Sequence, residues 1–360
     1  MKVIVSAGGT GGHLYPALAL AEYIKKQDPE SEFLFVGTTD RLEAEIVPSL
    51  GYPYKGLKVK GMVGNPLNKL KNAFIFIKSL HTSKQILKEF KPDIVVGFGG
   101  YPSASIVLAA SFKKIKTMIH EQNSIIGLTN KILIKRVDEI ICCYEKAYQA
   151  FPKEKTKLLG NPRAQAVHET ELTDIHDLYN VDKKRKIVVI VMGSLGSATI
   201  NDLMKKALEK FNGLSYDIIY ATGKAYYEEM KTFSYQNNIH IVPYIDDMPS
   251  VLSSCDLLVT RGGATTLAEI TSLGTPAVII PSPYVVANHQ EYNARELCDH
   301  GAAEMILEKD LTAENLFKKI NNLMIHDDLR TQRKQASMAL GKPQACHDIY
   351  QEILKLIKRN

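Results

Sequence analysis

Short apolar runs rich in β-branched residues alternate with longer segments of helical periodicity through the first 160 residues. Because strands that alternate with helices are joined by crossovers, this order predicts an α/β domain with a parallel sheet. The expected strands are Val3–Ser6, Phe33–Val36, Ile94–Gly97, Thr117–His120 and Glu139–Cys142. Helices are expected to begin near His13, Arg41, Leu67, Ser103, Leu128 and Glu145.

The same alternation restarts after a polar, charged stretch from Glu169 to Lys186, which we interpret as a linker or hinge. The strands expected in this second series are Ile187–Met192, Ile218–Ala221, Ile239–Val242, Leu257–Thr260, Ala277–Ile280 and Glu304–Ile306. A chain of 360 residues is too long for one ordinary domain and comfortable as two. We therefore expect one α/β domain at residues 1–163, another at 164–342, and a C-terminal helix at 343–360 that returns to the first domain.

Each series contains a glycine-rich turn between a strand and a helical segment. The first glycine turn is Ser6–His13 and the second glycine turn is Thr260–Glu269. Glycine lets the backbone approach a ligand closely, and the amides at a helix N-terminus favour an anion. The first glycine turn fits neither the dinucleotide fingerprint nor the P-loop. Together the two turns predict a phosphorylated ligand in a cleft between two domains.

Five loops of polar or glycine character come directly after expected strands. They are Gly8–His13, Gly97–Tyr101, His120–Asn123, Gly193–Ser197 and Arg261–Glu269. Ligands of open parallel sheets bind beyond the carboxyl ends of the strands. These loops are therefore expected to form a single site.

Three groups in these loops can do chemistry, and each also has a structural interpretation. His13 is the only nearby group that exchanges a proton around neutral pH, although it could instead cap a helix or bind a loop. Arg261 and the amides beside it suit a diphosphate. Glu269 can accept two ribose hydroxyls, or it can simply favour a helix N-terminus. The polar run His120–Asn123 should face a ligand or its own members, because burial without partners is costly.

Metal ligands and disulfides are not expected. The chain has no HxxxH, HExxH or CxxC motif, and the Asp246–Asp247 pair is interpreted as a helix cap. Its five cysteines are interpreted as reduced thiols of a cytosolic protein. The first strand leaves no room for a signal peptide, and no apolar stretch approaches the roughly 20 residues that span a bilayer.

The net charge of +6 is unevenly distributed, with nine lysines and one acidic residue between Lys55 and Lys91. Within this window Phe74, Ile77 and Leu80 recur near helical spacing among the lysines. Such a segment can lie on an anionic membrane surface, or it can be a core-facing helix with a solvated lysine face. No nucleic-acid motif is present, so nucleic acid is not an expected partner.

Several motifs in register along nearly the whole chain resemble the MurG family of bacterial UDP-N-acetylglucosamine transferases. They are Gly8–His13, Gly37–Glu43, Gly97–Tyr101, His120–Asn123 with Gly127–Lys131, Gly160–Arg163, Gly193–Ser197, Tyr244–Met248, Arg261–Glu269 and Asn288–Ala294. The resemblance implies a GT-B fold: two Rossmann-like parallel-sheet domains with an interdomain cleft. It implies an N-terminal domain for the acceptor and the membrane, and a C-terminal domain for UDP-N-acetylglucosamine.

The resemblance also implies a set of site residues. The substrate-binding set is Thr10, Gly11, Gly12, Asn123, Arg163, Ser194, Ile245, Ala264, Thr265, Thr266, Leu267, Ala268, Glu269 and Gln290. Ile245 would meet the uracil through its backbone, and Glu269 would bind the ribose. His13 is the first choice as catalytic base, with Glu121 as its partner or rival. The chain departs from the family at Leu195, where a glutamine is usual, and at Gln290–Glu291, where the family often has two glutamines.

The implied reaction is inverting transfer of N-acetylglucosamine to the 4-hydroxyl of the muramoyl sugar of lipid I, which gives lipid II for peptidoglycan. No cofactor and no bound metal are implied. The resemblance favours the membrane interpretation, with peripheral binding at the cytoplasmic face through Lys69, Phe74, Ile77, Lys78 and Leu80. Three alternatives remain: another glycolipid glycosyltransferase, a UDP-N-acetylglucosamine 2-epimerase, and a non-catalytic UDP-sugar-binding protein.

Overall fold

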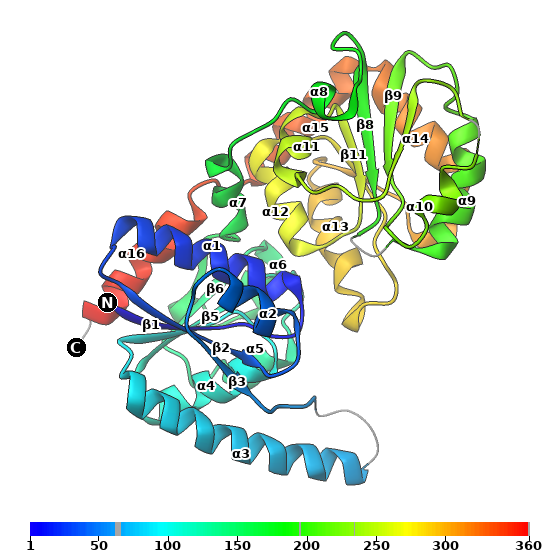
Figure 1. The fold of residues 1–360 in the computed structure, drawn as a ribbon. Helices are drawn as coiled ribbons and strands as arrows, with labels where there is room; N and C mark the ends of the chain where they lie inside the picture. The colour runs from blue at the N-terminus through cyan, green and yellow to red at the C-terminus, as the bar shows by residue number, and fades with distance from the viewer. Residues whose placement is uncertain (62–65, 194–195, 234, 359–360) are drawn as a thin grey trace. The chain divides into compact units, whose positions relative to one another are not determined.

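The computed structural model describes residues 1–61, 66–193, 196–233 and 235–358, which form two compact units. The first unit is Met1–Ala166 together with the C-terminal segment that begins at Gln344. The second unit is Val167–Pro343. Each unit is an α/β domain with its own sheet and core (Figure 1).

The sheet of the first unit has seven strands in the order β3-β2-β1-β4-β5-β6-β7, all parallel. The strands are β1 (Lys2–Ser6), β2 (Glu32–Thr38), β3 (Tyr54–Leu57), β4 (Ile94–Gly97), β5 (Lys116–Glu121), β6 (Glu139–Cys142) and β7 (Thr156–Leu158). All five expected strands are confirmed to within two residues at each end. The two edge strands, β3 and β7, were not anticipated because neither has an apolar run.

Helices cover both faces of this sheet (Figure 1). The helices on one face are α1 (Gly11–Gln27), α2 (Leu42–Ser49) and α16 (Ala345–Lys358), and those on the other are α3 (Pro66–Phe90), α4 (Tyr101–Phe112) and α5 (Leu128–Leu133). The short helices are α6 (Glu145–Ala150) and α7 (Arg163–Ala166). Because successive strand residues point to opposite faces, Val3 and Val5 pack on the side of α1 while Ile4 packs on the side of α4.

The C-terminal helix α16 packs against α1 and α7 in the first unit. Its apolar side chains Ile349, Ile353 and Leu356 are buried in the core that α1 shares with β1. Cys346 Sγ donates to the carbonyl of Pro162 at 3.3 Å, and Glu352 pairs with Lys157 of β7. This helix therefore closes one face of the first sheet.

The sheet of the second unit has six parallel strands in the order β10-β9-β8-β11-β12-β13. The strands are β8 (Lys186–Val191), β9 (Tyr216–Ala221), β10 (Ile239–Val242), β11 (Leu257–Thr260), β12 (Ala277–Ile279) and β13 (Glu304–Met305), each within two residues of its expected bounds. The helices are α8 (Ile175–Tyr179), α9 (Ala198–Glu209), α10 (Tyr227–Met230), α11 (Met248–Ser254), α12 (Ala264–Leu273), α13 (His289–Asp299), α14 (Ala313–Ile325) and α15 (Asp327–Leu340). Helices α9 and α14 share one core with β8 and β9.

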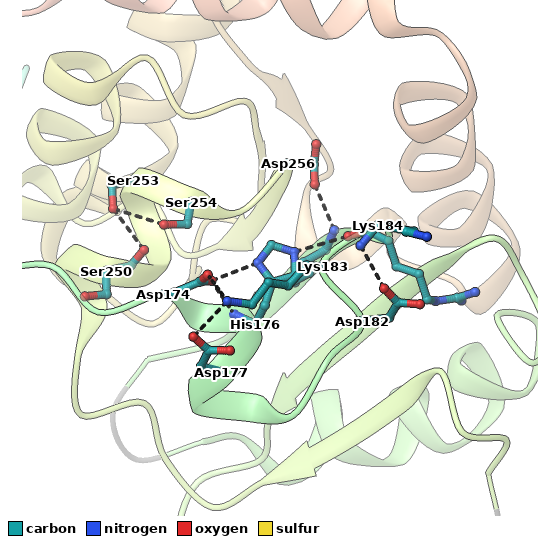
Figure 2. A network of polar contacts seen from close by, with 12 residues as sticks. Asp174, His176, Asp177, Asp182, Lys183, Lys184, Ser250, Ser253, Ser254 and Asp256 are labelled. Carbon is teal, nitrogen blue, oxygen red and sulfur yellow. Dashed lines mark hydrogen bonds and ion pairs between the residues drawn. The ribbon is translucent and has the colours of Figure 1, made fainter.

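The expected linker at Glu169–Lys186 is wrong, because the segment belongs to the second unit. Asp174 caps α8 by accepting from the amide and the ring of His176, and it also pairs with Lys183 at 3.2 Å (Figure 2). The amide of Thr173 donates to Ser250 Oγ of α11 at 2.8 Å. The charged side chains therefore bind one another within this segment, and the amide of Thr173 joins the segment to α11.

Candidate functional site

Each glycine turn follows a strand beside the point where the strand order of its sheet reverses. In the first sheet the strand order reverses between β1 and β4, and in the second between β8 and β11. Such reversal points open a crevice at the carboxyl ends of the strands, where ligands of doubly wound sheets bind. The loops after β1 and β4, and those after β8 and β11, are the expected glycine loops. Each sheet therefore places its glycine loops where the fold favours a ligand.

His13 lies in the first turn of α1, against the loop that follows β4. Its Nδ1 is 2.9 Å from the carbonyl oxygen of Gly8 and 3.4 Å from Thr10 Oγ1. A carbonyl can only accept, so the contact with Gly8 places the proton on Nδ1 and leaves Nε2 as the basic nitrogen. The ring packs on Gly99, where a Cβ would come within 2.9 Å of Nε2. The loop after β4 therefore needs glycine to accommodate this imidazole.

Thr10, Gly11 and Gly12 surround His13 at the start of α1. Thr10 is the N-cap residue, but its side chain makes no capping hydrogen bond. A Cβ on Gly12 would meet nothing closer than Thr10 Oγ1 at 3.8 Å, whereas one on Gly11 would lie 2.9 Å from the ring of Tyr15. Gly12 is exposed, so it is the member of this group with the most room for a ligand.

Glu43, at the start of α2, binds the first glycine turn through the amide of Gly9. Its side chain is 1% exposed, and its two carboxylate oxygens lie 3.3 and 3.2 Å from the amide nitrogen of Gly9. Thr38 adds its amide at 3.0 Å and its hydroxyl at 2.8 Å, both to Oε1. Sequence reasoning gave Glu43 no role, although it ends the Gly37–Glu43 motif. An acidic residue just after the strand beside β1 was the available signal.

Glu121 lies at the end of β5, and both oxygens of its carboxylate accept hydrogen bonds from residues of the same unit. Oε1 accepts from the amide of Asn123 at 3.1 Å, and Oε2 accepts from the amide of Gly127 at 2.8 Å and from Asn130 Nδ2 at 2.9 Å. The side chain is 2% exposed. This arrangement suits an anchor for the loop 121–130 better than a base that must reach a substrate. It also brings Asn123 to the carboxyl end of the sheet.

His120 is a buried neutral histidine beneath the site. Its Nε2 donates to the carbonyl of Gly160 at 3.0 Å, and its ring stacks on Phe98. Burial and, to a smaller extent, the charge of His13 lower the pKa of His120 to about 4. Gln122 Nε2 donates to the carbonyl of Phe98 at 2.7 Å, which joins this loop to the one after β4. The polar run His120–Asn123 is thus largely satisfied by its own unit.

Arg163 begins α7 at the far end of the first unit's sequence, directly after the Gly160–Pro162 stretch. Its amide donates to Asn161 Oδ1 at 3.0 Å, and its side chain is half-buried. The first unit thus supplies Thr10, Gly11, Gly12, Asn123 and Arg163 of the expected substrate-binding set. The remaining members belong to the second unit.

Arg261 of the second glycine turn is not free to bind a diphosphate as the sequence suggested. Its Nη1 donates to Glu308 Oε2 at 2.5 Å and to the carbonyl of Ile280 at 3.1 Å. Both members of this ion pair are largely buried, at 12% and 9% exposure of the side chain. The cation is therefore committed to the structure of the turn. What remains for an anion is the N-terminus of α12.

Helix α12 begins at Ala264, with Gly263 as its N-cap. Gly263 has no side chain with which to cap the helix, and a Cβ there would meet no atom of the described residues within 4 Å. The hydroxyl of Thr265 is buried without a hydrogen-bond partner among the described residues. An N-terminus with this character suits a phosphate oxygen as acceptor.

Glu269 is buried one turn further along α12, at 6% exposure. Ala264 and Leu267 are buried as well, while Thr265, Thr266 and Ala268 are half-buried. The second glycine turn is held to α13 by Asn293, whose Nδ2 donates to the carbonyl of Gly262 at 3.3 Å. The sequence offered no sign of this role for Asn293.

Gln290 lies beside the second glycine turn, because a Cβ on Gly262 would approach its carbonyl oxygen to 2.4 Å. Its Oε1 accepts from the amide of Ser282 at 2.9 Å. Glu291 is instead held by Arg295 and Asn288, which lower the pKa of its carboxyl. Of the pair Gln290–Glu291, the glutamine is therefore the better candidate for a sugar contact.

The remaining expected contacts lie in the loops after β8 and β10. Ser194, like Leu195, lies outside the described residues. Ile245 has a buried side chain, which agrees with a contact made through its backbone. Asp247 is the N-cap of α11 and accepts from the amide of Ser250 at 3.1 Å, so the capping interpretation of this acidic pair is confirmed.

Helix α3 carries the expected membrane segment. Phe74 and Ile77 are 59% and 62% exposed, and Lys78 Nζ lies 4.9 Å from the centre of the Phe74 ring. Leu80 instead packs against the core of the first unit. The side chain of Lys69 lies outside the described residues. The exposed apolar patch on α3 therefore consists of Phe74 and Ile77, with Lys78 beside them.

The described residues lack both a metal-binding cluster and a membrane-spanning helix. They contain no group of three or more His, Cys, Asp or Glu side chains that could hold a metal ion. Over the same part of the chain, no helix is both long enough and apolar enough to cross a bilayer. No disulfide joins the cysteines in the described part of the chain.

The chain matches known proteins along its whole length. Residues 3–142 match the glycosyltransferase family 28 N-terminal domain, and residues 187–349 match the glycosyltransferase family 28 C-terminal domain. The chain is 44% identical, over 100% of both chains, to UDP-N-acetylglucosamine--N-acetylmuramyl-(pentapeptide) pyrophosphoryl-undecaprenol N-acetylglucosamine transferase 1 of Bacillus cereus.

Solved structures agree with this match. The crystal structure of Acinetobacter baumannii MurG aligns with a TM-score of 0.82 at 28% identity, covering 98% of this chain and 99% of that one. A putative UDP-N-acetylglucosamine 2-epimerase from Listeria monocytogenes aligns with a TM-score of 0.74 at 14% identity, covering 100% and 97%, and so shares the fold alone. The expected two-domain α/β architecture is confirmed. The chain belongs to the MurG family of glycosyltransferases, within glycosyltransferase family 28.

Proposed function

We propose that this protein transfers N-acetylglucosamine from UDP-N-acetylglucosamine to the 4-hydroxyl of the muramoyl sugar of lipid I, which yields lipid II at the cytoplasmic face of the cell membrane. The observation that carries the proposal is the full-length match to the Bacillus cereus transferase, at 44% identity. The fold alone would not distinguish a transferase from an epimerase, since both kinds of protein align with this chain.

His13 is the proposed catalytic base. The contact of its Nδ1 with the carbonyl of Gly8 places the ring proton on Nδ1, so Nε2 is the nitrogen proposed to take the proton of the acceptor hydroxyl. As that proton moves to Nε2, the hydroxyl oxygen bonds to the anomeric carbon and the bond from that carbon to UDP breaks. The electron pair of the broken bond leaves with the β-phosphate. Glu121 is the weaker candidate, because its carboxylate already accepts from Asn123, Gly127 and Asn130.

The N-terminus of α12 is the proposed site for the departing diphosphate. Arg261 is committed to Glu308, so the backbone amides and the helix dipole supply the stabilisation. Glu269, one turn further along, is proposed to bind the ribose hydroxyls, and the backbone of Ile245 the uracil. Ser194 and Gln290 complete the proposed donor contacts.

The decisive experiment is transfer of radiolabelled N-acetylglucosamine to a soluble lipid I analogue. We expect a labelled product that depends on both substrates, with little competition from UDP-glucose. Incubation of UDP-N-acetylglucosamine without acceptor should give no 2-epimer. An epimer, or tight binding of the donor with no transfer to the lipid I analogue, would refute the proposal.

The exposed patch on α3 is proposed as the membrane contact. Apolar and basic side chains together bind anionic lipid surfaces weakly and reversibly, which suits an enzyme whose acceptor is held in the membrane. Ile77→Ser should lower binding to phosphatidylglycerol vesicles several-fold in a sedimentation assay. Ile325→Ser, at a residue of similar exposure in the second unit, is the matched control and should bind as wild type does. Equal binding by both variants would exclude the patch.

A further inference from the structure

A single peptide group joins a buried carboxylate to the proposed catalytic base. The amide nitrogen of Gly9 lies 3.3 and 3.2 Å from the two oxygens of Glu43, and the carbonyl of Gly8 lies 2.9 Å from Nδ1 of His13. This N–H and this carbonyl are the two ends of the same peptide unit. In a planar trans peptide they point in opposite directions, so Glu43 and His13 bind opposite edges of one rigid group.

We propose that Glu43 is a positioning residue for His13, and that it acts through the Gly8–Gly9 peptide group. By holding the N–H of Gly9, the carboxylate fixes the orientation of the peptide and aims its carbonyl at Nδ1. The proposal rests on the proposed function, in which His13 is the base. The first glycine turn then does more than let a ligand approach the backbone, since it transmits the effect of the Glu43 charge to His13.

The carboxylate of Glu43 is itself held rigidly. Thr38 contributes two hydrogen bonds to Oε1, from its amide and from its hydroxyl. A Cβ on Gly37 would come within 2.5 Å of Glu43 Cγ, so the backbone of β2 lies directly against the side chain. No lysine or arginine pairs with Glu43 in the part of the chain that the structure describes. The N–H of Gly9 is therefore one of the few groups that balance its charge.

The carbonyl of Gly8 is covered from the other side. A Cβ on Gly100 would lie only 2.5 Å from this oxygen, and Gly100 has a φ of 82°, which glycine adopts readily. This backbone covers the carbonyl end of the peptide group, where Gly8 is buried, whereas Gly9 at the other end is exposed. Because electrostatic interactions strengthen as water is excluded, the charge of Glu43 can polarise the peptide and make the Gly8 carbonyl a stronger acceptor.

The consequence for catalysis follows from the proton balance. The acceptor hydroxyl gives its proton to Nε2 of His13, so the ring becomes an imidazolium while the Nδ1 proton stays in place. Glu43 remains a carboxylate, and no proton crosses the peptide. The polarised carbonyl of Gly8 stabilises the positive charge that forms on the ring, as a carboxylate bound directly to Nδ1 would do.

Other titratable groups face this pair. His120 lies close enough to feel the charge of His13, and it is neutral at physiological pH because its pKa is about 4. Tyr54 and Asp40 interact with each other near Glu43, and burial raises the pKa of Tyr54, so its hydroxyl stays neutral. The loop residues Phe98–Gly100 that cover the ring carry no titratable side chain. Glu43 is the carboxylate that the Gly8–Gly9 peptide group joins to His13.

The test compares Glu43→Gln with Glu45→Gln, which removes an exposed carboxylate from the same turn of α2. The first readout is the titration of His13 by NMR in the substrate-free full-length protein, with His13→Gln to assign the signal. Loss of the Glu43 charge should lower the midpoint by about 0.5 to 1 pH unit, because the imidazolium is less stabilised. Glu45→Gln should leave the midpoint in place.

The second readout is the pH profile of transfer. In Glu43→Gln, kcat should fall about 10-fold while KM for UDP-N-acetylglucosamine stays within about twofold, and the acidic limb of kcat/KM should move to lower pH. Glu43→Asp keeps the charge and should recover both the midpoint of His13 and part of kcat. A merely structural carboxylate would instead give losses that follow the thermal stability of each variant.

The outcomes separate this proposal from the proposed function. If wild-type protein transfers nothing to lipid I, the proposed function fails, but the NMR titration still tests the link from Glu43 to His13. An unchanged His13 midpoint in Glu43→Gln, with the fold intact, overturns the positioning role. If Glu43→Gln does not fold, a His13 midpoint in Glu43→Asp far below the wild-type value overturns it equally, since that variant retains the charge.

Discussion

The glycine turn that follows β1 and the one that follows β11 have the same local order of strand, glycines and helix N-terminus. They differ in what their amides meet. In the first glycine turn the amide of Gly9 binds the carboxylate of Glu43. In the second, the N-cap of α12 is Gly263, and Thr265 beside it has a buried hydroxyl without a partner among the described residues.

This difference shows that a glycine-rich turn does not by itself identify a phosphate site. In the first unit the chain supplies its own anion, so part of the turn is already occupied and its task is to hold His13. In the second unit the nearby cation, Arg261, is neutralised by Glu308 and leaves the helix N-terminus for an external anion. A substrate contact at Thr10, Gly11 and Gly12 of the first glycine turn stays a prediction.

The largest expected effect concerns the first glycine turn. His13→Ala removes the first-choice base, so kcat should fall by about 1,000-fold. UDP binding, measured by calorimetry, should stay within twofold of wild type, because the second unit carries the nucleotide. A variant that keeps its turnover would exclude His13 as the base. A variant that loses UDP binding would contradict our assignment of the nucleotide to the second unit.

The buried His120 gives the first unit an acid sensitivity that the second should lack. Its pKa is about 4 in the folded protein and about 6.5 in the unfolded chain, so the unfolded state binds the extra proton between these values. Stability that is present above pH 6.5 is therefore lost as the pH falls toward 4, by about 2 kcal/mol between pH 7 and pH 5.

Hydrogen exchange measured by mass spectrometry can locate this loss. After correction for intrinsic rates, peptides that cover β5 should exchange about 30-fold faster at pH 5 than at pH 7, while those that cover β11 should change little. His120→Gln can still donate to the carbonyl of Gly160 but cannot titrate, so the difference should vanish. A wild-type response that persists in His120→Gln would assign the acid sensitivity to another group.

Glu269 tests the nucleotide role of the second glycine turn. Glu269→Gln should weaken UDP binding about 20-fold, because an ionised acceptor of the ribose hydroxyls is replaced by a neutral one. The titration of His13 should not move. In wild type, 2′,3′-dideoxy-UDP should also bind weakly, and Glu269→Gln should lose little further affinity for it. Equal losses for both nucleotides would mean that Glu269 does not contact the ribose.

The smallest expected effect uses the glycines of the second turn. Gly263→Ala places a Cβ where the unit has no atom within 4 Å, at a φ of −70° that alanine adopts easily. Stability should therefore be unchanged, while UDP binding should weaken about threefold to tenfold as the methyl group meets the phosphate. Gly262→Ala is the contrasting variant, since its Cβ would lie 2.4 Å from the carbonyl of Gln290 and should destabilise the unit. Unaltered UDP affinity in Gly263→Ala would argue against a phosphate at this position.

Periodicity predicted the central strands because each is a continuous apolar run buried on both faces. The edge strand β3 (Tyr54–Leu57) escaped notice because lysine and glycine interrupt it and because its pairing with β2 depends on distant residues. The charges of 169–186 resembled those of a linker, since sequence does not show that Asp174 and Lys183 pair with each other.

The site was predictable in its loops and less so in its contacts. The order of strands and helices along the chain was enough to place His13 and Glu269 in loops or helix starts at the carboxyl ends of their sheets. The commitment of Arg261 to Glu308 joins residues 47 positions apart, and Glu43 reaches back 34 positions to Gly9. No local pattern encodes such pairings. The sequence therefore predicted which residues carry charge, but not which of those charges the fold neutralises.

A crystal structure of the wild-type protein with UDP tests the division between the two turns most directly. We predict that the diphosphate lies within hydrogen-bond distance of the main-chain amides that begin α12, and that the carboxylate of Glu43 still binds the amide of Gly9. A diphosphate bound to the first glycine turn, with Glu43 displaced from Gly9, would contradict this account.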